Sequence, residues 1–160
     1  FDSQIKSLGF VMLIIATMFL ILFKSIALMV IGIVPNLISA LLVLGIMGIM
    51  KLPLDMMTIT IAAITVGIAV DNSIHYIYRF KEELKNCGNY EQTILICHST
   101  IGKAIFFTGI TVIFGFSILI LSNFIPTIIF GVLTGFAMLV ALIAVLTLLP
   151  RMLITLKPIK

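Results

Sequence analysis

The sequence predicts an all-α membrane protein, a bundle of five transmembrane helices. First, 62% of the 160 residues are hydrophobic and 10% are charged, whereas a soluble domain has about 45–50% apolar and about 25% charged residues. Second, the apolar residues form unbroken runs near the roughly 20 residues that cross a bilayer as a helix, without the alternation of a membrane barrel. This composition excludes a soluble enzyme, a disordered chain and a disulfide-rich secreted module.

Five apolar segments have about the length of a membrane span: residues 8–23, 26–50, 56–78, 101–121 and 127–149. Together they predict a single transmembrane domain over residues 1–160. The first segment is short, so we expect Ile5 and Ser7 to extend its helix while the charged end of Lys6 reaches back to the interface. Pro35 interrupts the second segment, which is tolerated where neighbouring groups satisfy the freed backbone carbonyl.

The linker over residues 79–100 is the longest polar connection. We expect residues 79–85 to continue the third helix into water and residues 87–89 to end it. Residues 90–99 then predict a short amphipathic helix that lies along the cytoplasmic interface.

The basic residues predict the orientation, because cytoplasmic connections carry an excess of Lys and Arg. Lys6 and Lys51 fall on one predicted side, and the other side carries the larger group: Lys24, Arg79, Lys81, Lys85, Lys103, Arg151, Lys157 and Lys160. The N-terminus is therefore expected outside the cytoplasm and the C-terminus inside, in an inner or plasma membrane. Cys87 and Cys97 then face a reducing compartment as free thiols. The basic residues form no stripe with interleaved aromatics, so a nucleic-acid partner is not expected.

Asp71 is the carboxylate that falls inside a predicted span, and ionisable groups at membrane depth mark functional sites by default. It lies about 22 Å along the helix from Met56 at the 1.5 Å rise, past the midplane. His75 follows at i+4 on the same face and Asn72 is adjacent, while Gly67 lies one turn earlier and leaves room for another helix. A carboxyl group deprived of water can load and release a proton near physiological pH. The alternative is that Asp71 is structural, hydrogen-bonded across a helix interface.

Hydroxyl and small residues recur in the last two spans. Thr108 and Thr111 are candidates to face Asp71, but plain helix–helix packing is the favoured explanation for them. Four glycines are expected at close helix contacts: Gly109, Gly115, Gly131 and Gly135. His98, beside Cys97, is expected to be a solvated or interfacial side chain, because one Cys/His pair is a poor zinc site.

Enzyme functions find no support in the sequence. It contains no H-E-x-x-H, G-x-S-x-G or Walker A pattern, and an intramembrane aspartyl protease needs two carboxylates within the bilayer. We therefore expect no catalytic residue, no metal site and no cofactor.

The segment GIAVDNSIH over residues 67–75, followed by RFKEE over residues 79–83, resembles the fourth transmembrane helix of the resistance–nodulation–division (RND) superfamily. The closest similarity is to its MMPL-type, sterol-sensing-domain-like exporters. Residues 102–122 and 148–150 are similar to the fifth helix and to the end of the sixth. The resemblance implies that the chain is a piece of a longer polypeptide and holds helices two to six of one transporter half.

The same resemblance implies a function and its residues. It implies export of lipids or other hydrophobic molecules driven by the proton-motive force, with a proton relay at Asp71, His75, Asn72, Thr108 and Thr111. The expected partners are the lipid bilayer, a hydrophobic substrate and the other transporter half, in the same longer chain or in a second subunit; a homo-oligomer stays open. Many members carry Tyr where this chain has Asn72, which puts a Tyr-dependent pairing in question.

Two alternatives come from other functional classes. One is a lipid-sensing or sterol-sensing-like membrane domain that does not pump, and the other is an accessory subunit of protein export, whose related segment is G-x-A-V-D-A-N. Ile74–His75 and Arg79–Phe80 favour the exporter over the accessory subunit. Asp71 favours a pump over a sensor, since a pump needs a titrating acid within the membrane.

Overall fold

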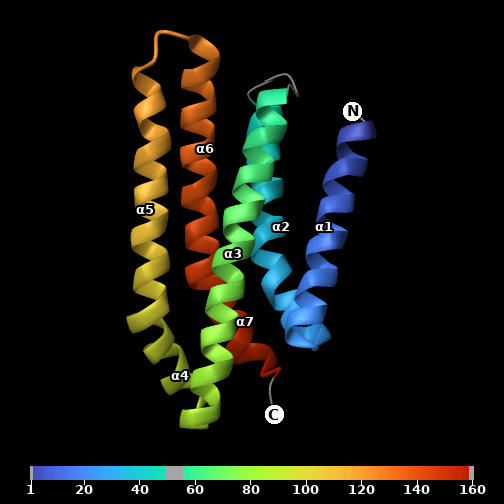
Figure 1. Cartoon of the computed structure of the whole chain (residues 1–160), viewed down its shortest axis with the longest axis vertical. Coiled ribbons are helices and arrows are strands. Elements are labelled where there is room, and N and C mark those ends of the chain that lie inside the picture. Colours follow the sequence, from blue (N-terminus) through green and yellow to red (C-terminus); the bar gives the residue numbers. More distant parts are fainter. Residues whose placement is uncertain (1, 50–55, 159–160) are drawn as a thin grey trace.

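The structure, a computed structural model, describes residues 2–49 and 56–158. These residues form helices and short connections, with no strand among them, which confirms the all-α prediction (Figure 1). The helices, in chain order, are α1 Asp2–Phe23, α2 Ile26–Ile49, α3 Met56–Cys87, α4 Tyr90–Cys97, the π-helix η1 His98–Gly102, α5 Lys103–Ser117, the 3-10 helix η2 Ile118–Leu121, α6 Ile125–Ile143, the π-helix η3 Ala144–Leu148 and α7 Leu149–Leu156.

Four helical segments within the described part of the chain are long and apolar enough to cross a membrane: Ile26–Ile49, Thr60–Cys87, Tyr90–Leu121 and Ile125–Leu156. They match the second to fifth predicted spans. In α1 the apolar stretch is the shorter Gly9–Phe23, but the helix itself begins at Asp2, so residues 5–7 extend it as expected. Residue 50 and the connection predicted over residues 51–55 lie outside the described residues.

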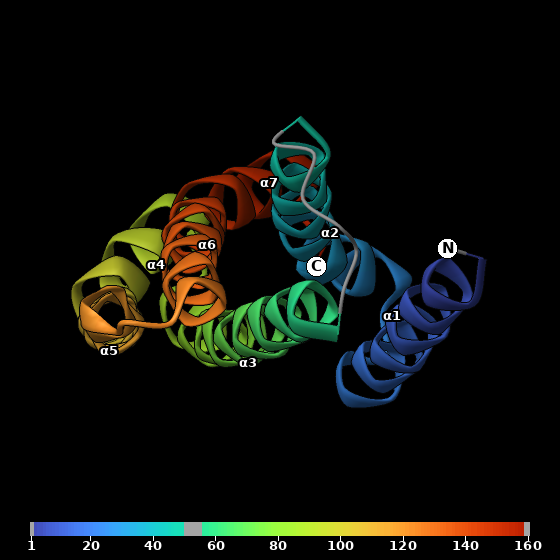
Figure 2. The same cartoon turned by 90° about the horizontal axis from the view of Figure 1, so that it is seen from above.

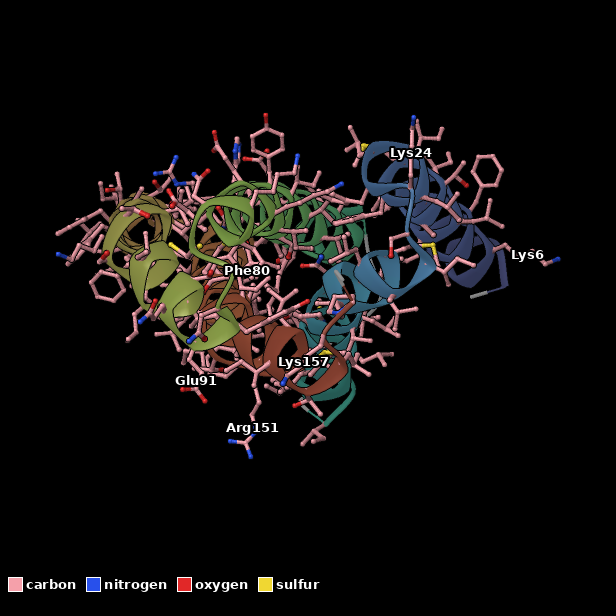
Figure 3. The ribbon with its side chains drawn as sticks, turned by 90° about the horizontal axis from the view of Figure 1, so that it is seen from below. Lys6, Lys24, Phe80, Glu91, Arg151 and Lys157 are labelled. Atoms are coloured by element: carbon pink, nitrogen blue, oxygen red, sulfur yellow. The ribbon has the colours of Figure 1, made fainter. Side chains whose placement is uncertain are left out.

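Three helices form the centre of the bundle and two flank it. The central group consists of α2, α3 and α6 with its continuation α7, whereas α5 packs on α6 at one edge and α1 packs on α2 at the other (Figure 2). The core includes Tyr76, Phe80 and Leu149, all fully buried. Figure 3 shows Phe80 pointing into the bundle, while Lys24 and Arg151 point away from it. The buried apolar residues form this larger cluster and a second, smaller one of Val43, Met47, Ile61, Leu133 and Ala137 between α2, α3 and α6.

A glycine and an asparagine make the corner between α3 and α4. Gly88 adopts a positive φ of 66°, which costs glycine little, and its N–H donates to the Leu84 carbonyl at 2.9 Å. Asn89 then caps α4, because its side-chain oxygen accepts the Glu91 N–H at 3.0 Å. The predicted extension of the third helix and its break at residues 87–89 are both confirmed.

The expected amphipathic helix is present as α4, but it does not stand apart from the fourth span. From Tyr90 to Leu121 the helical segments follow one another without a break, through η1 and α5. The reason is local: Gly102 keeps helical angles of −60° and −41°, and no proline falls in this stretch. One long, bent helix therefore replaces a helix followed by a separate span.

Two polar side chains bond to the backbone of α2 beside Pro35. Asn36 Nδ2 donates to the Gly32 carbonyl at 2.7 Å, and Ser39 Oγ donates to the Pro35 carbonyl at 2.8 Å. Both side chains are almost fully buried. The carbonyl that Pro35 leaves without its helical donor is that of Ile31, four residues earlier, so these bonds satisfy the two buried polar side chains and do not replace the missing donor.

The described residues of the two predicted basic groups lie at opposite ends of the bundle. The N-terminus and the turn between α5 and α6 lie at one end of the bundle (Figure 1). The junction of α1 with α2, the corner between α3 and α4, and the end of α7 lie at the other. The described members of the larger basic group lie on or near these last segments, with Lys103 at the start of α5. One end of the bundle is therefore strongly basic; Lys160 lies outside the described residues.

Candidate functional site: a carboxylate and an imidazole on the outer face of α3

Asp71 and His75 form a pair on the outside of the bundle. His75 Nε2 lies 3.5 Å from Asp71 Oδ1, one helical turn apart, and the side chains are 61% and 69% exposed, respectively. The pair lies within the Thr60–Cys87 segment that is long and apolar enough to span a membrane. In the described chain, the polar contact of Asp71 is with its own helix, so the hydrogen bond across a helix interface that a structural role requires is not formed here.

The face of α3 that carries this pair differs from the face that packs. Its exposed residues recur every three or four positions, which places them on one side of the helix: Thr60, Ala63, Gly67, Asp71 and His75. A methyl group added at Gly67 would meet nothing within 4 Å. The opposite side of α3 is buried, with Val66, Ser73 and Tyr76 among its residues. The exposed face of α3 thus carries small and ionisable side chains, whereas a lipid-facing surface would carry large apolar ones.

A buried polar contact lies behind the pair, between α2 and α3. Ser73 is fully buried, donates to the Ala69 carbonyl at 2.9 Å, and accepts from Asn36 Nδ2 at 3.4 Å. Asn36 Oδ1 is buried and has no hydrogen-bond partner. Asn72, next to Asp71, is half-buried. The Asn36–Ser73 contact escaped the sequence analysis, since an asparagine in an apolar run signals polarity but not its partner 37 residues away.

Thr108 and Thr111 do not join this site in the structure. Both lie exposed on α5, and their hydroxyls donate at 2.8 Å to carbonyls of the same helix, those of Ala104 and Phe107. No hydrogen bond in the described chain links them to Asp71. The expectation that they face this carboxylate is therefore not met within these helices, because α5 packs on α6 at the edge of the bundle.

The five glycines expected at close contacts divide into two groups. A Cβ at Gly109 would collide with the Leu142 side chain, one at Gly131 would lie 2.7 Å from the Phe116 carbonyl, and Gly135 lies just within contact of Ser117. These three allow α5 and α6 to approach closely. Gly67 and Gly115 have nothing within 4 Å of an added Cβ, so their faces are open in this structure.

His98 is more firmly held than the sequence suggested. Its Nδ1 lies 2.9 Å from Tyr76 Oη and its Nε2 lies 3.1 Å from the Leu146 carbonyl. Pro150 has no N–H to donate to that carbonyl four residues earlier, so the imidazole takes the place of the missing donor. His98 therefore joins three helical segments and is not a freely solvated side chain.

The chemistry available at the outer face of α3 is proton exchange. No group of three or more His, Cys, Asp or Glu side chains in the described chain is arranged to hold a metal ion. Asp71 and His75 bring a carboxylate and an imidazole within 3.5 Å of each other, on a face that is not covered by these helices.

Comparison with known proteins identifies relatives. The sequence model of the MMPL family matches residues 1–157. The chain is 29% identical over 120 residues to Putative membrane protein MJ1562 of Methanocaldococcus jannaschii, covering 75% of this chain and 31% of that protein. It is 36% identical over 144 residues to Putative membrane protein YdgH of Bacillus subtilis, covering 86% of this chain and 16% of that protein. No solved structure matches the chain significantly.

Proposed function

Since the chain belongs to the MMPL family, we propose that it is the transmembrane module of an exporter that uses the proton-motive force to move lipids or other hydrophobic molecules. The observation that carries the proposal is the Asp71–His75 pair on the outer face of α3, within a segment long and apolar enough to span a membrane. The chain spans less than a third of the relatives it matches, so the proposal concerns the longer protein of which this module would form a part.

The outer face of α3 supports a two-part transporter. An exposed carboxylate facing lipid is costly, and such groups almost always face a bundle interior or a water-filled cavity. Ala63 and Gly67 on the same face are small residues of the kind that let a second helix approach closely. We therefore propose that another helix, from the second transporter half, covers this face and encloses Asp71.

The proposed relay follows from the chemistry of the two side chains. Enclosure removes water from the carboxyl group and favours its neutral, protonated form. When the transporter opens to the cytoplasm, the carboxylate releases the proton, and His75 one turn closer to the basic end provides an acceptor on the way. The proposed orientation places the basic end of the bundle in the cytoplasm and the N-terminus outside it.

The decisive experiment replaces Asp71 in the complete protein. Asp71→Asn keeps size and hydrogen bonding but removes titration, so we expect normal membrane insertion and loss of proton-driven efflux of a hydrophobic dye from proteoliposomes. His75→Gln should shift the pH dependence of efflux and keep part of its rate. Glu91→Gln, which neutralises an exposed carboxylate on α4, is the matched control and should transport normally.

Three other outcomes would favour another class of function. Near-normal efflux by the Asp71→Asn protein would show that no titrating acid is needed there and would overturn the pump. Specific lipid binding without any proton-driven efflux, in the unmodified protein as well, would favour the lipid-sensing domain. Secretion defects without an efflux defect would favour the protein-export accessory.

A further inference from the structure

A pocket lies between the end of α1 and the last turns of α3. Its volume is about 310 Å³, and it is lined by two residues of α1 and four of α3: Leu22, Phe23, Tyr78, Lys81, Glu82 and Lys85. One wall is apolar and the other carries charged groups. The proton pathway proposed above does not use any of these residues.

The pocket lies where the apolar part of the bundle ends. α1 stops at Phe23, and Lys24 leaves the helix with a positive φ of 50°. α3 continues past this level to Cys87, as Figure 1 shows at the lower end of the bundle. In a membrane the junction of an apolar helix end with a charged helical extension lies at the headgroup region. The charged wall therefore faces headgroups and the apolar wall faces acyl chains.

The ion pairs of α3 leave this wall with a net positive charge. Arg79 holds both neighbouring carboxylates, with 3.3 Å to Glu82 and 2.6 Å to Glu83. Lys81 and Lys85 have no ion pair within the described chain. Two ammonium groups one turn apart thus line the pocket, and an anionic group satisfies them better than a zwitterionic one.

A shallow groove on the surface of α1 continues the pocket. It has a volume of about 360 Å³ and is lined by residues of this helix alone: Ile14, Thr17, Met18, Ile21 and Leu22. Leu22 lines both the pocket and the groove. The one hydroxyl among these side chains, that of Thr17, is bonded to the Leu13 carbonyl at 2.8 Å, so the surface offered is apolar. From Leu22 to Ile14 it extends about 12 Å along the helix at the 1.5 Å rise, toward the middle of the membrane.

We propose that the pocket and the groove on α1 together bind one phospholipid with an anionic headgroup. The phosphate lies against Lys81 and Lys85, the Tyr78 hydroxyl offers a further donor, and an acyl chain lies along α1 from Leu22 toward Ile14. Three features favour this occupant: the positive charge of the α3 wall, the apolar groove along α1, and the position of the pocket at the level of the headgroups. The proposal requires only that the chain lies in a membrane and is independent of proton transport.

The experiment is native mass spectrometry of the complete protein, purified in mild detergent and titrated with phosphatidylglycerol or with phosphatidylcholine of the same acyl chains. We expect one tightly bound phosphatidylglycerol. The double variant Lys81→Gln/Lys85→Gln should weaken its binding about 30-fold, the effect of two interfacial cations. The control Lys103→Gln/Lys157→Gln makes the same charge change outside the pocket and should leave this binding unchanged.

Further variants test the apolar half of the site. Met18→Trp fills the groove on α1 and should weaken phosphatidylglycerol binding, whereas Val30→Trp, at an exposed position of α2, should not. Three results would each overturn the proposal. Phosphatidylcholine could bind as tightly as phosphatidylglycerol, or the control double variant could lose as much binding as Lys81→Gln/Lys85→Gln. Glycerol 3-phosphate, which has no acyl chains, could also compete as well as the intact lipid. Saturating occupation of the pocket by another part of the complete protein would appear as no bound lipid and would overturn it as well.

Discussion

Gly32 of α2 lies directly against the aromatic ring of Phe19 in α1. A Cβ at Gly32 would collide with that ring, approaching its Cδ1 and Cζ at 2.9 Å, and Phe19 itself is fully buried. The ring also lies 5.7 Å from that of Phe23, centroid to centroid. Because α1 is at the edge of the bundle and packs mainly on α2, this contact is central to how α1 is held.

We therefore expect Gly32→Ala to loosen α1. Forcing an extra carbon into a packed contact costs about 1–3 kcal/mol, and the change should appear as a lower midpoint of thermal unfolding in detergent. Gly45→Ala, in the same helix, adds the same carbon where nothing lies within 4 Å and should have little effect. Equal destabilisation by both substitutions would mean that helix flexibility, and not the contact with Phe19, is responsible.

This contact also shows where prediction from the sequence ends. Apolar runs and the Gly88–Asn89 corner are local signals, so the helices, their approximate bounds and the break after Cys87 could be predicted. The contacts between Gly32 and Phe19, and between Asn36 and Ser73, depend on how helices rotate against each other, which local composition does not determine. The outward direction of Asp71 could not be predicted for the same reason. A carboxylate in an apolar run indicates a polar environment within the membrane, but it does not indicate which helix provides that environment.

The partly buried bond between Tyr76 and His98 gives the second prediction. Tyr76→Phe removes the hydroxyl that lies 2.9 Å from the His98 ring. Because the His98 side chain is exposed and water can replace this partner, the substitution should cost about 0.5–1.5 kcal/mol, the net value of one hydrogen bond. The loss should be measurable as a lower unfolding midpoint. Tyr78→Phe is the matched control, since Tyr78 is 66% exposed on the same helix; measured in lipid-free detergent, it should change stability by no more than about 0.5 kcal/mol.

The two cysteines test the orientation of the bundle. Cys87 at the end of α3 is half-buried and Cys97 is fully buried, so a bulky thiol reagent should label Cys87 alone. If the basic end of the bundle is cytoplasmic, a membrane-impermeant maleimide should fail on intact cells and succeed on inverted vesicles. Cys87→Ser should abolish the signal from inverted vesicles. Labelling of Cys87 from outside intact cells would reverse the proposed topology.

The last prediction separates the steric role of the α3 face from its proton chemistry. Gly67 lies one turn before Asp71, and nothing in the described chain is within 4 Å of a Cβ added there. Gly67→Leu should therefore be harmless if this face meets lipid, because a leucine side chain fits an apolar environment.

If a helix of the second half packs closely on this face, the same leucine should separate the two and block efflux while insertion and expression stay normal. The measurement is dye efflux from proteoliposomes that hold the complete protein, beside the amount of protein inserted. Gly45→Leu, at an equally open position of α2, controls for the loss of glycine from a helix. Because Gly67→Leu leaves the Asp71 carboxyl intact, unimpaired efflux would contradict a closely packed partner at this face without affecting the case for Asp71 as the proton carrier, which rests on Asp71→Asn.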